Sequence, residues 1–577
     1  MERYFNLLKQ WCDGLISQQI TQFKQKGLYG GILCPACALI HGRCMGLVHP
    51  FLYLAEKTGD NKYISAACRL IDWSDFMFDS DGGIRNDTIC EWKGTTAFTS
   101  IAFTGAIRGY AELLEEPYRK KLDEKNRAAL QFLCRTFDTG SGNINYLAGT
   151  ACALEIGGKL YGIEEYRTAA EKCARKMMSY ITDDGLIYGE GGHDWGHISP
   201  KGCRPIDIGY NVEESLNLLS EYAISSGDSA VLQRCLEMAR SHADFLLPDG
   251  GWDNSFGTRM DKWTYWGSRT SDGCQPGYTM LSSFDRSLGY VARTNLAVLE
   301  KSTADGLLYG GLGLKRHHEP ACVHHAFTHA EGLVCTLEWI EKLGQVSADF
   351  PKRNGTRYLP SMDTYLYNGN GWRGTITGYD EGEKEYCHPS GGALSLLYHK
   401  RAGILLVSSM SRFERYEIMN TQRHLYDCDH PFTMRLQVGG TPLAFSNILD
   451  KTAKLKQTEH NAFEASGRIC GEKGENPAQG EIHFCTRYIF DQDTVELQFE
   501  HDGKDVDFVL PVVTEAAEET ECSNGFYFIK NGCKVSFDFG RLCVKRERIF
   551  NHVPGFEGRE FFVPCVPNCF SVRITVC

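Results

Sequence analysis

The first 345 residues alternate segments of helical hydrophobic periodicity with short glycine-rich turns. Apolar side chains that recur every three or four residues form one face of a helix, which then packs against a neighbouring element. Two such faces are clear in the chain: Ala129, Phe132, Leu133 and Thr136, and Val212, Leu216, Leu219 and Ala223. This part of the chain is therefore predicted to be helical.

The turns between these segments resemble one another and lie about 45 to 65 residues apart, which leaves room for two helices each time. Their sequences are KGLYGGI (26–32), DGGIRND (81–87), GSGNINY (140–146), DGLIYGE (184–190), DGGWDNS (249–255) and DGLLYGG (305–311). Repeated helical hairpins must stack to bury their apolar faces, and about six of them commonly close into a ring. We predict an (α/α)6-like toroid over residues 1–345, with the turns and a functional site on one rim.

Past residue 350 the pattern changes to the alternation of β-strands. Val495, Leu497 and Phe499 alternate with polar residues, as do Val535 and Phe537. Asn-Gly pairs at 524–525 and 531–532 are typical of hairpin turns. A domain of this size built from short strands needs two facing sheets. We predict an antiparallel β-sandwich over residues 355–577, with a groove where its sheets meet the rim of the toroid.

Length and composition fit two folded domains. The chain has 577 residues, of which 42% are hydrophobic and 23% charged, and its formal net charge is -12. A chain of this length exceeds one ordinary core. No basic stripe offers phosphate neutralisation, so a nucleic-acid partner is not expected. No uninterrupted apolar run of about 18 residues occurs, so no membrane span is expected either.

The start of the chain and the cysteines bear on the compartment. The first residues, MERYFNLLKQWCDGLI, have the charge pattern of an amphipathic helix and not of a signal peptide. We expect a cytoplasmic protein if Met1 is the natural start, and a periplasmic or secreted one if a signal segment was removed. Many of the 24 cysteines lie inside apolar helical patterns, which favours a reducing compartment. The sequence makes no prediction of the oligomeric state.

The stretch WTYWGSRTSDGC (263–274) gathers aromatic rings and positive charges on an acidic chain. Trp263 and Trp266 offer flat faces that stack on sugar rings, and Arg259, Lys262 and Arg269 can hold a carboxylate. Together they indicate an acidic sugar as the ligand. The alternative is that both tryptophans are core anchors of a long loop and that the charges form a solvated face.

A second candidate cluster lies in GGHDWGHISPKGCRPIDIGYNVEESLNLL (191–219). Its candidates for substrate contact or proton transfer are His193, Trp195, His197, Tyr210 and Asn211. Asn211 with Glu214 three residues later also fits a plain helix cap, and both interpretations stay open. A metal at His193 is disfavoured because no convincing third ligand lies nearby.

Histidines and cysteines elsewhere mark further candidate positions. His324 and His325 in CVHHAFTHAEGL are expected to bind substrate or to be buried and hydrogen-bonded. His388 precedes two apolar strands that could bring it to the rim, and a purely structural role for it stays open. The run CPACALIHGRC (34–44) has Cys and His spacing of the zinc type, but ten helical residues rise about 15 Å. If the run is helical, its ligands cannot share one ion. We therefore expect no metal there and place His41 and Arg43 on an inner helix face.

Three segments carry a resemblance to a known family: DNSFGTRMDKWTYWGSRTSDG (253–273), GYNVEESL (209–216) and HPSGGALSLLYHKRAGILLVSSM (388–410). Together with the ringed helical hairpins, they resemble the toroid-plus-sandwich polysaccharide lyases of the heparinase II/III-like kind. Among these, the L-rhamnose-α-1,4-D-glucuronate lyases, which remove rhamnose caps from glucuronate, are the nearest match. The zinc site in the sandwich of some relatives finds no matching ligands after His388, so neither a metal nor another cofactor is expected.

The resemblance implies an acidic polysaccharide as substrate and β-elimination at a 4-O-linked uronic acid. The proton on C5 is a very weak acid while the neighbouring carboxylate keeps its charge, so a lyase must first neutralise that charge. The residues expected to do so are Arg259, Arg269 and Asn211. A base then takes the proton and an acid protonates the leaving O4. The residues expected in these roles are Tyr265 or Tyr210 with His193, and His388 from the second domain. The expected substrate-binding residues are Trp195, His197, Arg259, Lys262, Trp263, Trp266, His324 and His325.

Two other functions stay open at this point. A glycoside hydrolase acting on acidic glycans needs two carboxyl groups across the scissile bond, and the chain offers Glu190, Asp194, Asp249 and Asp253. The aspartates lie in turns, where capping explains them equally well. A non-catalytic glycan-binding protein would keep the aromatic and arginine surface and tolerate loss of every base. The product distinguishes these functions, because a lyase leaves a conjugated, ultraviolet-absorbing 4,5-unsaturated uronate.

Overall fold

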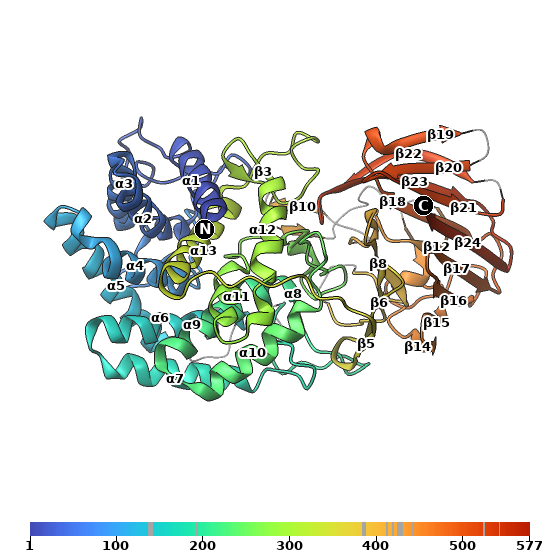
Figure 1. Ribbon diagram of the computed structural model, residues 1–577, viewed down its shortest axis with the longest axis horizontal. Coiled ribbons are helices and arrows are strands. Elements are labelled where there is room, and N and C mark those ends of the chain that lie inside the picture. Colours follow the sequence, from blue (N-terminus) through green and yellow to red (C-terminus); the bar gives the residue numbers. More distant parts are fainter. Residues whose placement is uncertain are drawn as a thin grey trace.

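Helices and long strands occupy separate halves of the computed structural model (Figure 1). The structure describes residues 1–136, 142–191, 194–382, 388–410, 414–417, 421–423, 431–440, 443–522, 525–541 and 543–577. In the described part of the chain, the last α-helix ends at Leu343 and the first strand of the second half begins at Gly355. Among the described residues, none of the helices combines the length and the apolar character that crossing a bilayer requires.

The helical half is built from hairpins, as the sequence predicts. Its inner helices are α2 (Val48–Thr58), α4 (Thr96–Tyr110), α6 (Asn145–Tyr161), α9 (Leu216–Ser226), α11 (Gln275–Ser282) and α13 (Val323–Leu343). Its outer helices are α1 (Glu2–Ser17), α3 (Asn61–Met77), α5 (Glu116–Thr136), α7 (Glu164–Met178), α10 (Ser229–Ala243) and α12 (Val291–Lys301). Each inner helix contacts the next, and α13 contacts α2, so the ring closes. The predicted toroid is confirmed, with one difference in pairing: α1 packs as the outer partner of the last inner helix, α13.

The glycine-rich turns link each outer helix to the next inner helix, and several of them share one local structure. An antiparallel bridge spans the turn at Phe78–Ile84, Ile181–Ile187 and Leu246–Trp252, and β3 (Thr303–Ala304) pairs with β4 (Leu307–Leu308) in the same position of the repeat. Gly250, inside one of these turns, has φ of 98°, which favours glycine. A Cβ there would lie 2.2 Å from the carbonyl oxygen of Thr294 on α12. Gly250 is therefore required by both the backbone conformation and the close packing.

The second half is an antiparallel sandwich of three larger sheets. One sheet has the order β5 (Gly355–Leu359), β6 (Thr364–Gly369), β7 (Trp372–Thr377), β8 (Ala393–His399) and β9 (Gly403–Val407). A second has the order β13 (Phe445–Ser446), β12 (Arg435–Val438), β18 (Asp507–Val513), β23 (Phe556–Val563) and β22 (Val544–Asn551). The third has the order β14 (Lys454–Glu459), β15 (Ala462–Arg468), β16 (His483–Phe490), β17 (Thr494–His501), β24 (Cys569–Val576), β21 (Cys533–Asp538), β20 (Gly525–Lys530) and β19 (Glu519–Cys522).

One hydrophobic core joins these sheets and confirms the predicted strand faces. Val495, Leu497 and Phe499 of β17 are buried in it, together with residues from both five-stranded sheets. The predicted turn at 531–532 joins β20 to β21, with Asn531 and Gly532 both at positive φ, as a two-residue hairpin turn requires. The other predicted turn includes Asn524, which lies outside the described residues.

The two halves share buried apolar surface. Leu396, Val407, Val513 and Phe556 of the sheets belong to the same hydrophobic cluster as helices of the ring. A two-stranded sheet, β10 (Glu414–Glu417) with β11 (Thr421–Arg423), extends from the second half to the backbone of residues 260–262 at the rim. An apolar interface of this kind holds two domains in a fixed orientation, so residues from both halves can take part in one site.

Candidate active site

A tyrosine, an arginine and a glutamate meet at the rim of the ring. Tyr210 ends the short helix α8 (Ile208–Tyr210), Glu190 ends the turn after α7, and Arg259 precedes the aromatic stretch. The Arg259 guanidinium lies 4.2 Å from the centre of the Tyr210 ring, and its Nη1 donates to Glu190 Oε2 at 3.0 Å. The Tyr210 hydroxyl donates to the carbonyl oxygen of Arg269 at 2.8 Å and lies 2.9 Å from Thr270 Oγ1. The three segments thus bring a phenol, a cation and a carboxyl group together.

The local sequence fixes Tyr210 through a helix cap. The Asp207 side chain accepts the Tyr210 backbone N–H at 2.8 Å and also accepts from Asn254 Nδ2 at 3.0 Å. Asp207 is therefore the N-cap, and the cap by Asn211 that the sequence left open is not formed. The Asn211 amide instead donates to the carbonyl oxygen of Ile187 at 2.8 Å and lies 3.0 Å from His242 Nε2, deep in the helical packing.

Directly after Tyr210 the helix widens into a π-helical segment, η3 (Asn211–Ser215). Such segments often occur at functional sites because they change the direction of successive side chains. Glu213 accepts the Ser268 N–H at 2.7 Å and the Ser271 hydroxyl, whereas Glu214 accepts from Arg43 at 3.0 Å. Adjacent glutamates thus hold two different elements, the loop at 268–271 and the Arg43 side chain.

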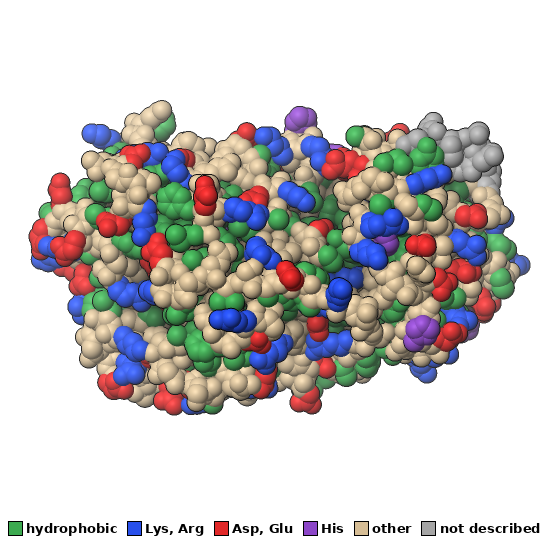
Figure 2. Space-filling view, viewed as in Figure 1, with side chains coloured by type: hydrophobic (Ala, Val, Ile, Leu, Met, Phe, Trp, Pro, Cys, Tyr) green, Lys and Arg blue, Asp and Glu red, His purple; other side chains and the backbone are tan. Residues whose placement is uncertain are grey.

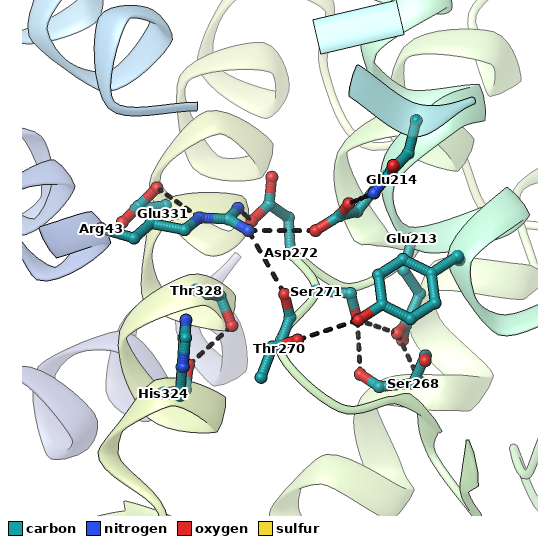
Figure 3. A network of polar contacts seen from close by, with 12 residues as sticks. Arg43, Glu213, Glu214, Ser268, Thr270, Ser271, Asp272, His324, Thr328 and Glu331 are labelled. Carbon is teal, nitrogen blue, oxygen red and sulfur yellow. Dashed lines mark hydrogen bonds and ion pairs between the residues drawn. The ribbon is translucent and has the colours of Figure 1, made fainter. Parts of the chain in front are cut away.

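Arg43 lies at the centre of a buried polar network inside the ring (Figure 3). Its Nη1 also donates to the carbonyl oxygen of Thr270 at 3.3 Å, its Nη2 pairs with Asp272, and its Nε lies 3.9 Å from Glu331 Oε2. Burial raises the pKa of each of the three surrounding carboxyl groups, on Glu214, Asp272 and Glu331, and the Arg43 charge opposes this rise. One guanidinium therefore holds together four segments that are far apart in the sequence.

Charge and burial set the protonation of the Tyr210 cluster. Burial raises the pKa of Glu190 to about 8, although the neighbouring Arg259 lowers it. Burial also raises the pKa of Tyr210 above its ordinary value, and Arg259 again opposes the shift. Near neutral pH, Glu190 is then largely protonated, and the Arg259 guanidinium lies beside a neutral phenol. A cation beside a group that can give or take a proton suits a site that receives an anion and transfers a proton.

Two aromatic residues beside this cluster, Trp92 and Tyr146, are not among the candidates predicted from the sequence. Trp92 is 43% exposed, and its ring meets the Tyr146 ring edge-on at 4.7 Å. Burial raises the pKa of Tyr146, as does the charge of Glu214, while Arg259 lowers it, which shows that Tyr146 lies close to the charged site. The signal available in the sequence was a tryptophan in the polar turn after DGGIRND, where an unburied indole is unusual.

The aromatic stretch itself forms the hairpin of β1 (Trp263–Thr264) and β2 (Gly267–Ser268) and lies in the core. Trp263 and Trp266 are 0% exposed, and their indole N–H groups donate to the carbonyl oxygens of Trp252 and Tyr309. They are core anchors, the alternative that the sequence left open. The Tyr265 hydroxyl donates to Asp249 at 3.0 Å, and burial followed by the Asp249 charge holds the pKa of Tyr265 well above its ordinary value. Tyr265 therefore lies apart from the Tyr210 cluster.

The predicted cations beside this hairpin are also enclosed. Lys262 is buried at the rim. Arg269 is buried as well, and its Nη2 donates to the carbonyl oxygen of His552, in the turn between β22 and β23. The alternative of a solvated face of positive charge is therefore not present at Lys262 and Arg269, and Arg269, predicted to hold a substrate carboxylate, instead joins the ring to the sandwich.

The predicted histidines and Trp195 take up different positions around the rim. Trp195 is buried and donates to the carbonyl oxygen of Gly142 at 2.6 Å, whereas His197 is exposed and pairs with Glu381 of the second half at 3.0 Å. His388 is buried, with Nε2 3.1 Å from the carbonyl oxygen of Tyr379. The Tyr379 hydroxyl donates to the carbonyl oxygen of Arg204 at 2.7 Å, so His388 supports the segment that leads to Tyr210. His193 lies outside the described residues.

His324 and His325 lie at the start of α13 and are buried. Burial lowers the pKa of both imidazoles well below the ordinary value. The charge of nearby His41 lowers the pKa of His324 further, and the charge of Arg269 lowers that of His325. The His324 ring packs against His41 at 4.4 Å, and the His325 ring meets Trp266 at 5.6 Å. Both are thus neutral interior residues close to the rim.

The segment at residues 34–44 differs from its predicted structure. It forms a turn and two isolated bridges, followed by the 3-10 helix η1 (Gly42–Leu47), so it is not an inner α-helix. The sequence-based argument against a shared metal assumed a helical rise of about 15 Å, and that assumption is wrong. Cys34, Cys37 and His41 instead present donor atoms that all lie within 4.8 Å of one another.

Comparison with known proteins shows that a chain with this ring and sandwich is a polysaccharide lyase that acts on acidic polysaccharides. Models of the ulvan lyase N-terminal domain and the ulvan lyase C-terminal domain match residues 8–354 and 356–577, respectively. A broad-specificity ulvan lyase from Formosa agariphila is 33% identical, over 96% of this chain and 90% of the relative. The chain belongs to the ulvan lyase family.

Solved structures of other lyases share the architecture. Heparinase III aligns with 97% of this chain and 78% of its own, at a TM-score of 0.57 and 11% identity. Chondroitin AC lyase from Streptomyces coelicolor A3, solved with chondroitin sulphate, aligns with 100% of this chain and 79% of its own, at a TM-score of 0.55 and 11% identity. At such identities the likeness shows the fold alone, and it confirms the predicted toroid followed by an antiparallel β-domain.

Proposed function

We propose that the chain cleaves an ulvan-type polysaccharide by β-elimination at glucuronate that carries rhamnose on O4. The Formosa agariphila relative is a broad-specificity ulvan lyase, and ulvan contains both glucuronate and rhamnose. The observation that carries the proposal is the Tyr210 phenol held 4.2 Å from the Arg259 guanidinium. A cation beside a proton-transfer group is what elimination next to a carboxylate needs.

In this proposal Arg259 pairs with the uronate carboxylate and allows negative charge to spread into it as the C5 proton leaves. The approaching substrate competes for Arg259 with Glu190, which is largely protonated near neutral pH because its pKa is about 8. Burial raises the pKa of Tyr210, so the phenolate is the minor form, and the Arg259 charge opposes this rise. In this ionised form, after its own proton has passed to solvent, Tyr210 takes the proton from C5. The C5–H electrons form the C4–C5 double bond, the C4–O4 bond breaks, and Tyr210 returns the proton to O4 of the departing rhamnose.

Tyr210 has the better geometry of the two tyrosines that the sequence suggested. Its neighbour Arg259 stabilises a phenolate, whereas Tyr265 donates to the carboxylate of Asp249, which opposes ionisation. His193 keeps its predicted role as a partner in proton transfer. Trp92 and Tyr146 offer ring faces for neighbouring sugars, in the place that the sequence analysis gave to Trp263 and Trp266.

Release of a terminal rhamnose cap and cleavage within a chain are the same elimination, because in both the group that leaves from O4 is rhamnose. The two activities differ in whether the rhamnose ends the chain or is linked to further sugars. We propose cleavage within the polymer, since the relative's name refers to ulvan itself. Rhamnose-capped glucuronate oligosaccharides and intact ulvan, compared at equal concentrations of the cleavable linkage, separate the two activities.

The test follows ultraviolet absorbance of the 4,5-unsaturated product during incubation with ulvan, with mass spectrometry of the ends. The Tyr210→Phe variant is expected to lose turnover by on the order of 10²–10⁴-fold while it still binds the polymer. Tyr265→Phe is the matched control: it loses a buried hydrogen bond to Asp249, which lowers stability by roughly 1–2 kcal/mol, but it keeps turnover. If the Tyr210→Phe variant keeps full activity, the assignment of Tyr210 as the base is rejected. If the wild-type protein is inactive on ulvan but cleaves another uronate polymer, only the proposed substrate is rejected.

A further inference from the structure

A group of sulfur and nitrogen donors lies beside the ring opening, apart from the Tyr210 cluster. The turn after the first bridge brings the sulfur atoms of Cys34 and Cys37 and the imidazole of His41 within 4.8 Å of one another. Cys37 Sγ lies 3.3 Å from His41 Nε2. The His41 ring packs against His324 at 4.4 Å, which holds Nε2 towards the thiols.

A fourth donor comes from the other end of the helical half. Cys322 is the N-cap residue of α13 and is buried, and its thiol lies within interaction range of the Cys34 thiol. The Cys34 sulfur also lies within 4.8 Å of the Cys37 sulfur. The sulfur of Cys34 is thus the meeting point of the early turn and the last helix of the ring.

The spacing of the three donors on the turn is close to that of a structural zinc site, and the Cys322 thiol is the candidate for the fourth position. Zinc binds thiolate sulfur at about 2.3 Å and imidazole nitrogen at about 2.0–2.1 Å in a tetrahedron, so its ligands lie roughly 3.5–4 Å from one another. The three donors of the turn are already within 4.8 Å without an ion. The donor set is soft, and such a set selects zinc over magnesium or calcium. The spacing Cys34-x-x-Cys37 also places two ligands on one tight turn, as zinc sites commonly do.

We propose that Cys34, Cys37, His41 and Cys322 hold a structural zinc ion that fastens the start of the ring to its last inner helix. The ion would connect the turn before η1, which carries Arg43, to the N-terminus of α13, which carries His324 and His325. It would thereby fix the position of the buried arginine network from one side. All four ligands come from the protein, which leaves no open position for substrate, so the role is structural and independent of the proposed elimination.

The first measurement is the metal content of the full chain, purified without immobilised-metal chromatography and supplied with zinc during expression. We expect about one zinc per chain by inductively coupled plasma mass spectrometry. Replacement by Co²⁺ should give the absorption bands of tetrahedral thiolate coordination. Cys322→Ser should keep the tetrahedral bands and lose about a third of the sulfur-to-cobalt charge-transfer intensity, because two of three thiolates remain.

Matched variants separate metal binding from the loss of a buried thiol. Cys37→Ser should lose the zinc, whereas Cys44→Ser, which changes a buried cysteine of the same segment outside the donor group, should keep it. A strong chelator should lower the Tm of the wild type and of Cys44→Ser but not that of Cys37→Ser. The proposal would be overturned if the wild type, expressed with sufficient zinc, contained no bound metal. It would also be overturned if mass spectrometry found a disulfide from Cys34 to Cys37 or to Cys322.

Discussion

Thr270 is a single residue whose backbone conformation is unfavourable for its side chain. Its φ is 65°, in the left-handed region that β-branched residues rarely adopt. Such a conformation costs about 1–3 kcal/mol and persists where neighbouring contacts hold it. Here Thr270 lies 2.9 Å from the Tyr210 hydroxyl and accepts from Arg43. The strain is thus located where we place proton transfer.

This location gives a prediction for substitutions at Thr270. Thr270→Gly is expected to be more stable than Thr270→Ala by about 1 kcal/mol, because only glycine avoids the penalty of the left-handed conformation. Both variants lose the hydroxyl beside Tyr210 and should lower kcat to a similar extent. The measurements are urea unfolding and initial rates on ulvan. Thr328, inside α13, is the control position, where alanine should instead be more stable than glycine by about 1 kcal/mol.

At the scale of elements, the sequence predicted what depends on local periodicity. The apolar faces of Val212 and Leu216 identified the helix before its partners were known, and the alternation of Val495 and Leu497 identified a strand. The repeated DG turns predicted the ring because each one marks the same step from an outer to an inner helix.

The sequence could not predict structure that depends on distant partners. The residue spacing of the Cys34–His41 turn also fits a helix, whereas its actual structure includes bridges from Leu33 to Ile40 and from His41 to the distant Asp87. Arg43 and Glu214, which pair directly, are 171 residues apart. Likewise, only the fold shows that Tyr210 faces Arg259 while Tyr265 faces Asp249.

The repeated turns yield a prediction of their own. Gly250→Ala places a Cβ 2.2 Å from the Thr294 carbonyl oxygen and also forces alanine to φ of 98°. We expect a loss of roughly 3 kcal/mol or more in the free energy of unfolding, because packed backbone must move as well. Gly162, at the end of α6, also has positive φ, but a Cβ there meets no atom within 4 Å. Gly162→Ala should therefore cost only about 1 kcal/mol, and equal losses for the two variants in urea unfolding would contradict the role of close packing.

At the scale of the whole molecule, charge is distributed differently inside and outside. Lys and Arg side chains alternate with Asp and Glu side chains over the face shown in Figure 2. The interior, in contrast, holds several carboxyl groups whose pKa values are raised chiefly by burial, among them Glu190, Asp207 and Asp253. The folded protein thus keeps protons that the unfolded chain would release at the same pH.

This difference gives stability a defined dependence on pH. The pKa of Glu190 is about 8 in the folded protein and 4.5 ordinarily, so between these values the folded state binds more protons than the unfolded state. Its contribution to stability is complete below pH 4.5 and is lost as the pH rises through about 8. Glu190→Gln should remove this part of the decline, on the order of a few kcal/mol, in urea unfolding measured from pH 5 to 9. Glu237→Gln is the control, because hydrogen bonds from Gln233 and Arg234 lower the pKa of this more exposed carboxyl group. The Glu237→Gln variant should show the same decline in stability with pH as the wild type. If the Glu190→Gln variant also loses stability with pH as steeply as the wild type, then Glu190 is ionised in the folded state.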